Sequence, residues 1–240
     1  QAAYDEALAY AKDRKQFGKA IIEFPAVYDM LATIKAKLDA GRALLYQTSR
    51  YVDIYKALDD IARERKLTPE ERQEQKRYAK LADSFTPLAK GMNSEYANQN
   101  AYDCIQVHGG SGFMMEYACQ RIYRDARITS IYEGTTQLQT VAAIRYVTNG
   151  AYAATLHEYE LIPCAPEFEG YLNRIKDMTR KLEACTNAVK EAQNQELLDF
   201  VARRLYEMAA VCVMSHLLLQ DATKAPELFA QSLNVYVNYA

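Results

Sequence analysis

The sequence predicts an all-α protein, namely a four-helix bundle followed by a helical C-terminal extension. Three observations support this prediction. The 240 residues include only nine glycines and six prolines, and three of these glycines fall within residues 109–112. Elsewhere, apolar side chains recur every three or four residues, as in amphipathic helices. No stretch of useful length alternates apolar and polar residues as a strand would. The class is therefore helix packed on helix.

The first two long helices have recognisable start signals. One helix is expected to begin near Pro25, because proline is favoured in the first turn and a single apolar face follows it. The segment "LTPEER" gives a second start, with Thr68 as N-cap, Pro69 in the first turn and Glu71 completing a capping box. The charged residues 59–80 around it are interpreted as a solvated hairpin between helices.

The next helices are expected from about Pro87 into Gln106 and from about Thr136 to Tyr152. Residues 157–170, "HEYELIPCAPEFEG", contain two prolines and interrupt the helical pattern, which indicates a linker. Two more amphipathic helices follow, and a last one after the final proline. The chain is therefore divided into a bundle domain (1–154), a linker (155–169) and a C-terminal helical extension (170–240).

Composition and charge exclude several classes of protein. The net charge of -2 gives no basic surface for nucleic acid or an anionic membrane. No apolar run is long enough to cross a bilayer, and no signal peptide is recognised. No C-x-x-C pair is present and the histidines are not clustered with cysteines, so no metal site is expected. The five cysteines are expected to be free thiols in a reducing compartment, the cytoplasm or, in a eukaryote, the mitochondrial matrix.

A glycine-rich segment, "QVHGGSGF" at residues 106–113, is a first candidate binding feature. A G-G-x-G run lets backbone N–H groups approach a ligand without interference from Cβ atoms. It is not a dinucleotide-binding fingerprint, because a helix and not a strand is expected before it. On glycine count alone, a helix C-cap and a tight turn are the favoured interpretation.

A second candidate is "RITSIYEGTTQLQT", residues 127–140, where Glu133 directly precedes a glycine amid apolar and hydroxyl side chains. Such a glutamate is either an exposed loop carboxylate or a base in a substrate site, and taken alone the first is commoner. Taken alone, Thr135 is a helix N-cap, Gln106 a solvated helix end and Arg14 a solvated helix residue.

Together these segments resemble the C-terminal helical domain of the acyl-CoA dehydrogenase family. "QVHGGSGFMMEYACQRIYRD" at 106–125 and "IYEGTTQLQ" at 131–139 match two family motifs. "ALAYAKDRKQFG" at 7–18 matches a third, a helix ending in R-x-x-F-G. The motifs occur in the family's order. The long segment 52–82 and the helical region beyond residue 150 resemble larger subfamilies with an extra C-terminal helical region.

The resemblance implies a cofactor, a reaction and partners. Family members combine an N-terminal helical domain, a middle β domain and a C-terminal bundle, form homodimers or homotetramers, and bind FAD. They desaturate acyl-CoA thioesters between Cα and Cβ and pass electrons to an electron-transferring flavoprotein. This chain lacks counterparts of the first two domains and an initiator methionine, so we expect a fragment that is inactive alone. An acyl-CoA oxidase and a non-catalytic helical scaffold are the alternatives.

The resemblance also assigns site residues. Glu133 is the expected base for the α proton, in an apolar setting that would raise its basicity, and its backbone N–H would polarise the thioester carbonyl. Tyr132 and Gly134 are expected against the substrate, and Thr135 and Gln137 against the flavin. Phe24-Pro25 replaces a common Phe-Gln pair of the family, so one cofactor contact is expected to be lost or replaced. Further FAD contacts, across a dimer interface, are expected from Arg14, Gln16, Phe17, Gln106, Val107, His108, Gly109 and Gly110.

Overall fold

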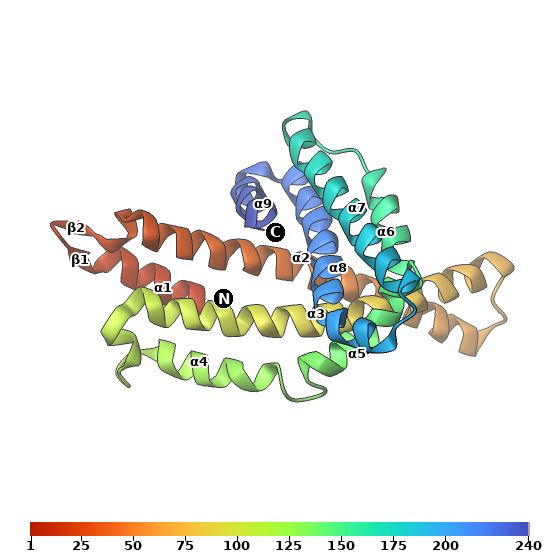
Figure 1. Cartoon of the computed structure of the whole chain (residues 1–240), viewed down its shortest axis with the longest axis horizontal. Helices are drawn as coiled ribbons and strands as arrows, with labels where there is room; N and C mark the ends of the chain where they lie inside the picture. Colours follow the sequence, from red (N-terminus) through yellow and green to blue (C-terminus); the bar gives the residue numbers. More distant parts are fainter. Residues whose placement is uncertain (240) are drawn as a thin grey trace.

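The computed structural model describes residues 1–239 and confirms the all-α prediction (Figure 1). In chain order the elements are α1 (Ala2–Asp13), β1 (Lys15–Gln16), β2 (Lys19–Ala20), the 3₁₀ helix η1 (Ile21–Glu23), α2 (Pro25–Glu64), α3 (Pro69–His108), η2 (Gly109–Phe113), α4 (Ala118–Thr129), α5 (Thr136–Thr148), α6 (Ala151–Glu160), η3 (Pro166–Phe168), α7 (Glu169–Glu191), α8 (Gln195–Lys224) and α9 (Pro226–Tyr239).

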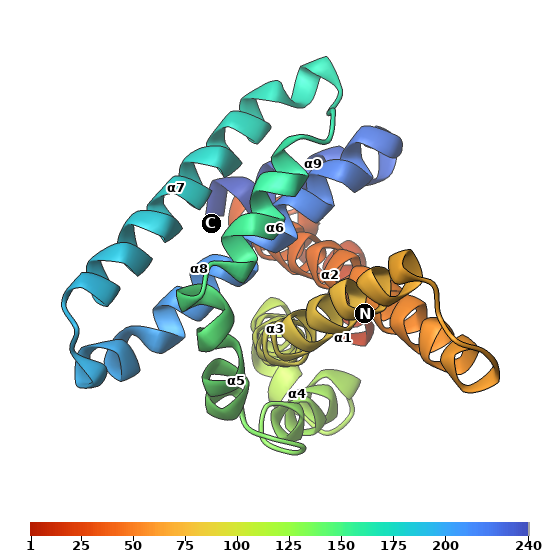
Figure 2. The ribbon, with the colours of Figure 1, turned by 90° about the vertical axis from the view of Figure 1, so that its right-hand side faces the viewer.

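Helices α2 and α3 form a long antiparallel hairpin that is the frame of the structure (Figure 1). Each has 40 residues and is therefore about 60 Å long. Helices α1 and α4 pack on one half of α3, and α5 packs further along it. Helix α8 crosses α2 and packs on α5, while α6 and α7 lie against α8 (Figure 2). Helix α9 returns to α2, so the C-terminal region is folded onto the hairpin.

The turn between α2 and α3 confirms the predicted capping box. Thr68 Oγ1 accepts a hydrogen bond from Glu71 N–H at 3.2 Å, and the Glu71 carboxylate accepts one from Thr68 N–H at 2.9 Å. Arg65 donates to both oxygens of that carboxylate, at 2.6 and 2.8 Å. The Arg65 guanidinium, with the Thr68 N–H, lowers the pKa of Glu71 to about 2. The capping box therefore sets where α3 begins.

The prediction that a helix begins at Pro87 is wrong, because α3 begins at Pro69 and continues through residue 87. An internal proline removes one N–H donor and crowds the preceding turn. Two carbonyls beside it accept hydroxyl groups from distant helices. Ser84 C=O accepts from Tyr152 at 2.6 Å, and Pro87 C=O accepts from Tyr206 at 3.1 Å. Tertiary packing thus stabilises the interrupted turn.

The helix expected from Thr136 to Tyr152 is divided in two. Helix α5 ends at Thr148, and α6 begins after Gly150, whose φ of +80° is left-handed and suits glycine. Residues 155–160, placed in the expected linker, complete α6. The domain boundaries inferred from the sequence stay a prediction.

A small hairpin after α1 was not expected from the sequence. Lys15 pairs with Ala20 and Gln16 with Lys19 in two-residue antiparallel strands. The two residues between them have positive φ, +50° at Phe17 and +83° at the glycine that follows. Such turns match the twist of paired strands. The strands are too short to show an alternating pattern, so no strand is predicted there from the sequence.

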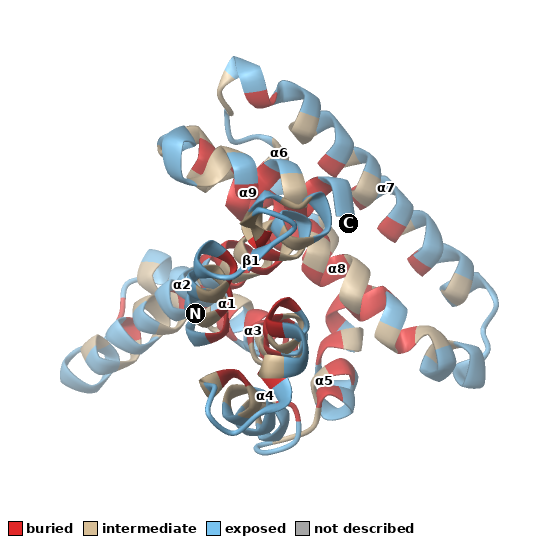
Figure 3. Cartoon of the chain, turned by 90° about the vertical axis from the view of Figure 1, so that its left-hand side faces the viewer, coloured by how far each residue is buried: buried red, intermediate tan, exposed pale blue. Residues whose placement is uncertain are grey.

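The described residues form two apolar cores. Figure 3 shows where the buried residues lie along the helices. The smaller one lies between α1, the start of α2, the end of α3 and α4, and includes Leu31 and Cys104. The larger one joins α2, α3 and α5 to helices α6–α9, and includes Phe85, Met214 and Leu233. The C-terminal helices therefore share one core with the bundle, which ties their position to that of α3.

The five cysteines are free thiols, as the sequence predicts. Among residues 1–239, no helix combines the length and apolar character needed to cross a membrane. Over the same described range, His, Cys, Asp and Glu side chains form no group of three or more suited to a metal ion.

We expect Tyr206→Phe to destabilise the protein by about 1 kcal/mol, because it removes a buried hydroxyl that donates to α3. The control is Tyr239→Phe, since Tyr239 is 63% exposed and its loss should change stability by less than about 0.5 kcal/mol. Thermal unfolding of the full-length variants measures both. Equal Tm values for the two variants would contradict a docking role for Tyr206.

Acid should destabilise the fold through His216. This residue of α8 is 1% exposed, and its Nε2 has no hydrogen-bond partner among residues 1–239. Burial, helped by the Lys176 ammonium, lowers the pKa of His216 from 6.5 to about 4. Between these pH values the unfolded chain binds a proton that the folded chain does not. The free energy of unfolding therefore falls on acidification, by on the order of 3 kcal/mol.

The substitution His216→Leu should flatten this pH dependence, measured as Tm against pH between 6.5 and 4. His157→Gln is the control, because Glu183 and Glu160 raise the pKa of the exposed His157. Its stabilising contribution is present below pH 6.5 and is lost as the pH rises, which is the opposite sign. An unchanged slope in His216→Leu would refute the assignment.

Candidate functional site

The loop between α4 and α5, residues 130–135, is closed by backbone hydrogen bonds. Tyr132 N–H donates to Ile128 C=O at 3.0 Å, which extends the last turn of α4. Thr136 N–H donates to Ser130 C=O at 3.2 Å, which brings the start of α5 back to the end of α4. Both ends of the segment that carries the candidate base are thereby fixed.

Two successive residues of this loop have a left-handed backbone, Glu133 with φ +51° and Gly134 with φ +93°. This conformation costs a residue with a Cβ roughly 1–2 kcal/mol and is free for glycine. A Cβ at position 134 would also lie 2.9 Å from the side-chain nitrogen of Gln139. The backbone itself therefore requires the glycine, and the Glu133 carboxylate is exposed at the tip of the turn.

Lys90 of α3 holds the loop at Gly134. Its Nζ donates to Gly134 C=O at 2.6 Å, and Gln139 Nε2 donates to the same oxygen at 3.2 Å. The Lys90 ammonium also lies 5.6 Å from the centroid of the Tyr132 ring, within cation–π range. A charge-assisted hydrogen bond is stronger than a neutral one. It offsets part of the strain at Glu133 and fixes the peptide beside the carboxylate.

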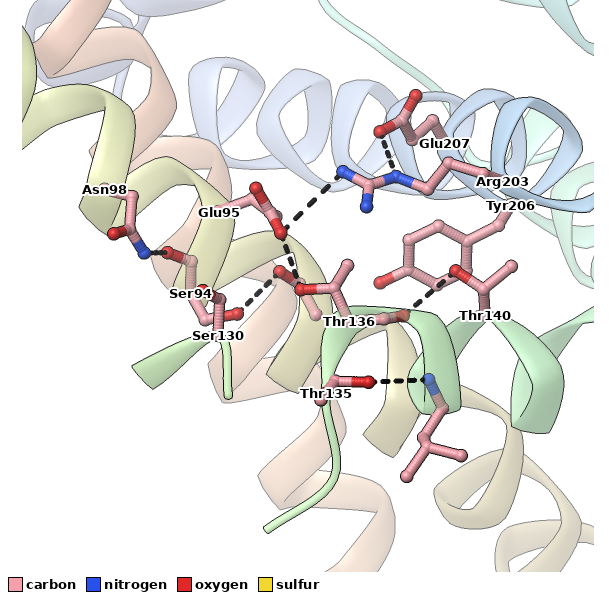
Figure 4. Close-up of polar contacts among 12 residues, drawn as sticks. Ser94, Glu95, Asn98, Ser130, Thr135, Thr136, Thr140, Arg203, Tyr206 and Glu207 are labelled. Carbon is pink, nitrogen blue, oxygen red and sulfur yellow. Dashed lines mark hydrogen bonds and ion pairs between the residues drawn. The ribbon is translucent and has the colours of Figure 1, made fainter. Parts of the chain in front are cut away.

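A second residue of α3, Glu95, holds the start of α5 (Figure 4). Thr136 Oγ1 donates to Glu95 Oε1 at 2.5 Å. Thr135 Oγ1 accepts from Leu138 N–H at 3.4 Å, so Thr135 is the N-cap of α5. The hydroxyls of two successive threonines thus have different partners, one in its own helix and one in α3.

The loop lies between two grooves. Tyr132 and Lys90 line a groove of about 680 Å³ between α2, α3 and α4, together with apolar residues such as Leu38. Thr135 and Gln137 line another groove, of about 520 Å³, whose walls are mostly polar. One short segment therefore contributes to an apolar site on one side and to a polar site on the other.

The remaining sequence-assigned residues lie at the opposite end of α4, by the hairpin and the glycine loop (Figure 1). Tyr10, in the last turn of α1, stacks on His108 with ring centroids 4.2 Å apart, and its hydroxyl donates to Ser111 Oγ at 3.3 Å. These contacts hold the glycine loop against α1. The hairpin that follows α1 presents Arg14, Gln16 and Phe17, all exposed.

Within this second group, side chains differ in what they can offer a ligand. Val107 and His108 are buried in or beside the smaller core, and His108 Nδ1 lies 2.8 Å from Cys104 C=O. Gln106, Gly109 and Gly110 are exposed. The side chains of Val107 and His108 are thus not accessible to a ligand. The two groups lie at opposite ends of α4, which has 12 residues and is therefore about 18 Å long.

Sequence reasoning did not identify Lys90 or Glu95 as site residues. Both lie in the middle of a long helix, where single charges are normally assigned to the solvated face. A signal is present for Lys90, which follows the apolar and small residues of "FTPLA" and precedes a glycine. For Glu95 the sequence offers none, because its partner Thr136 is far along the chain.

Two family models match this chain. The model described as "Acyl-CoA dehydrogenase, C-terminal domain" matches residues 1–147, and "Acyl-CoA dehydrogenase C terminal" matches residues 148–240. The first covers more than half of the chain, including the hairpin, the glycine loop and the Glu133 loop. The chain therefore belongs to the acyl-CoA dehydrogenase family, as the motifs predict.

Curated relatives include both reductases and dehydrogenases. The caffeyl-CoA reductase-Etf complex subunit CarC of Acetobacterium woodii is 37% identical over 139 residues, which are 58% of this chain and 30% of that protein. The 3-(aryl)acrylate reductase of Clostridium sporogenes is 35% identical over the same shares of the two chains. The probable acyl-CoA dehydrogenase FadE25 of Mycobacterium tuberculosis is 34% identical over 145 residues, 60% of this chain and 31% of that protein. The chain thus spans about a third of these relatives.

Two solved structures share the fold over nearly the whole chain. Caenorhabditis elegans ACDH-11, in complex with C11-CoA, has a TM-score of 0.77 and 19% identity, covering 99% of this chain and 39% of that one. An acyl-CoA dehydrogenase from Bacillus anthracis, complexed with FAD, has a TM-score of 0.76 and 20% identity, covering 99% and 44%. The C-terminal helices are therefore part of a known arrangement.

We expect Lys90→Met to loosen the Glu133 loop, because Gly134 C=O loses a charged donor. The half-buried position suggests a loss of about 1–2 kcal/mol in stability. Hydrogen–deuterium exchange of residues 131–137 in the full-length protein should become faster. Lys80→Met, at an exposed position of the same helix, is the control. If both variants exchange like the parent, Lys90 does not hold the loop.

Proposed function

We propose that the full-length protein containing this chain is an FAD-dependent acyl-CoA dehydrogenase that forms a double bond between Cα and Cβ of an acyl-CoA thioester. The observation that carries the proposal is the Glu133 loop, fixed from α3 and placed between an apolar and a polar groove. The family membership supports the reaction class. The catalytic site also needs parts of the protein that lie outside this chain, since the chain spans about a third of its relatives.

Glu133 is the proposed base for the α proton. Its carboxylate is exposed on a turn whose backbone is held by Lys90 and by the Thr136–Ser130 hydrogen bond, which keeps it in one place for an incoming substrate. The hydrogen bonds of the loop, within residues 1–239, do not use the Glu133 N–H. That N–H is therefore available to polarise the thioester carbonyl as negative charge develops.

The apolar groove suits the acyl chain. Tyr132 lies on its wall next to the base, so an acyl chain in the groove would bring its thioester end to residues 132–134. Gly134 follows the base in the same turn, so its backbone lies beside that end. We assign Tyr132 and Gly134 to substrate contact on this basis.

The residues on the other side of the loop fit FAD. Thr135 and Gln137 give the polar groove a hydroxyl and an amide for hydrogen bonds. At the far end of α4, an added Cβ at Gly109 or Gly110 would meet nothing within 4 Å, so a ligand can approach this backbone closely. The nearby Arg14 is exposed and suits a diphosphate. When bound, FAD would accept the β hydrogen as hydride.

We assign the two cofactor-binding groups to different copies of the protein in a homodimer or homotetramer. Thr135 and Gln137 lie beside the base, whereas Arg14, Gln16 and Phe17, with residues 106–110, lie by the opposite end of α4, a helix of about 18 Å. The Phe17 side chain is 95% exposed and projects from a hairpin tip. A neighbouring copy of the protein would cover Phe17. Arg14 of one copy would then reach the diphosphate of the FAD bound by the other copy.

An electron-transferring flavoprotein is the proposed electron acceptor. One relative is named as a subunit of a caffeyl-CoA reductase-Etf complex, which supports this partner. Anaerobic and aerobic reoxidation of the reduced full-length protein distinguishes this acceptor from oxygen. Rapid reoxidation by oxygen alone would instead favour the oxidase alternative.

A second candidate is the reverse reaction, reduction of an α,β-unsaturated thioester. It is favoured by the 37% and 35% identity to two reductases over 139 residues of this chain. The same residues serve, with protonated Glu133 giving its proton to Cα while a hydride arrives at Cβ. The direction then depends on the electron donor and not on this chain.

The proposal is tested by anaerobic titration of the purified full-length flavoprotein with acyl-CoAs of different chain lengths. Bleaching of the flavin absorbance by one length class supports dehydrogenation and defines the substrate. The dithionite-reduced protein is mixed with enoyl-CoAs in parallel to test the reverse reaction. Bound flavin that responds to no thioester in either direction would refute both candidates.

Glu133→Gln should reduce the rate of flavin bleaching by about 10²–10⁴-fold, because the amide cannot take the α proton. Its FAD content, measured by absorbance, should equal that of the parent, since the carboxylate is not placed against the cofactor. The exposed Glu64→Gln is the matched control and should react like the parent. Normal bleaching by Glu133→Gln would remove Glu133 from the mechanism.

A further inference from the structure

Helix α8, in the C-terminal region, docks on α3 directly beside the residues that hold the loop. Tyr206 is fully buried and donates to Pro87 C=O at 3.1 Å. Gly91 faces it, and a Cβ added there would overlap the Tyr206 hydroxyl. The same added Cβ would lie 3.3 Å from the Gln139 side chain of α5. Helices α3, α5 and α8 therefore meet at one closely packed point.

One turn before Tyr206, Arg203 reaches the carboxylate that holds α5 (Figure 4). Its Nη2 lies 3.8 Å from Glu95 Oε1, the oxygen that accepts from Thr136 Oγ1 at 2.5 Å. Arg203 Nε donates to Glu207 Oε1 at 2.6 Å, which orients the guanidinium along α8. The ion pair and the hydrogen bond meet at a single oxygen of Glu95.

We propose that Arg203 is a positioning residue, which acts through Glu95 on the first residue of α5 and thereby on the Glu133 loop. Thr136 is 2% exposed, and its N–H donates to Ser130 C=O at the other end of the loop. Movement of Thr136 would therefore shift both ends of the segment that carries the base. This role rests on the proposed function of Glu133, and it gives the C-terminal region a part in the reaction.

Electrostatics explains why the guanidinium is needed. Glu95 and Glu207 are carboxylates on facing helices, and Arg203 lies between them (Figure 4). Without the cation their charges would repel, and Glu95 would be free to turn toward the polar groove that it lines. The pair is partly exposed, with side-chain exposures of 39% and 27%. Its effect on global stability is accordingly small, and its main effect is on orientation.

The test compares Arg203→Gln with Arg204→Gln in the full-length flavoprotein. Arg204 is exposed and stacks near Phe200 with 5.3 Å between the guanidinium and the ring centroid, so it is a matched arginine on the same turn that does not face Glu95. First, kcat and KM are measured separately with the acyl-CoA that bleaches the flavin of the parent. Second, hydrogen–deuterium exchange is measured at residues 130–139.

For Arg203→Gln we expect kcat to fall roughly 10-fold while KM stays within about twofold, because a displaced base affects the reaction more than ground-state binding. Exchange should become faster at residues 130–139 and stay unchanged along α8. Arg203→Lys should recover part of kcat, since it restores the charge. Arg204→Gln should behave as the parent in both measurements.

The proposal is overturned if Arg203→Gln matches Arg204→Gln in kcat and in exchange. If Arg203→Gln instead exchanges faster throughout α8, that helix has unfolded, and the Arg203→Lys variant is used as the test. If α8 of Arg203→Lys exchanges like the parent and its kcat is higher than that of Arg203→Gln, the positioning role is supported. If kcat of Arg203→Lys is as low as that of Arg203→Gln, the positioning role is refuted. If no thioester bleaches the parent, the proposed function has failed, and exchange at residues 130–139 alone tests the link to Arg203.

Discussion

The site depends on α3 running through Pro87 as one continuous helix. Lys90, Gly91 and Glu95 follow the proline within about two turns. Lys90 holds the loop at Gly134, Gly91 allows α8 to pack closely on α3, and Glu95 holds the start of α5. A break at Pro87 would leave these three residues without a fixed position relative to the first half of α3, residues 69–86. The hydroxyls that reach the interrupted turn from α6 and α8 therefore support the geometry of the site as well as the stability of the core.

Features of the fold with local signals could be predicted from the sequence. The helix starts at Pro25, Thr68 and Pro226 each have a proline or a capping residue followed by an apolar face, and all three occur in the structure. The start assigned to Pro87 failed because the groups that make an internal proline tolerable, Tyr152 among them, lie far along the chain. No local pattern reports a hydroxyl donor that arrives from another helix.

The candidate site shows the same division. The motif around Glu133 predicts this loop as part of the site. The loop lies between two grooves, with Tyr132 lining the apolar one and Thr135 and Gln137 lining the polar one. The left-handed backbone at residues 133 and 134 cannot be read from one sequence, so the sequence assigns Gly134 only to substrate contact. His108 was assigned to the cofactor, yet its ring is stacked on Tyr10 inside the protein. Whether the end of a helix is buried depends on which other segments pack against it. The spacing of residues within a motif does not contain that information.

The packing at Gly91 makes the C-terminal helices difficult to exchange between family members. The space that a side chain would fill at this position is taken by the Tyr206 hydroxyl, so the two positions constrain each other across two regions of the chain. A chimera that combined this bundle with another member's C-terminal helices would have to carry the matching pair. For this chain, the success of such an exchange would therefore depend on the crossing of α3 and α8 more than on where the two sequences are joined.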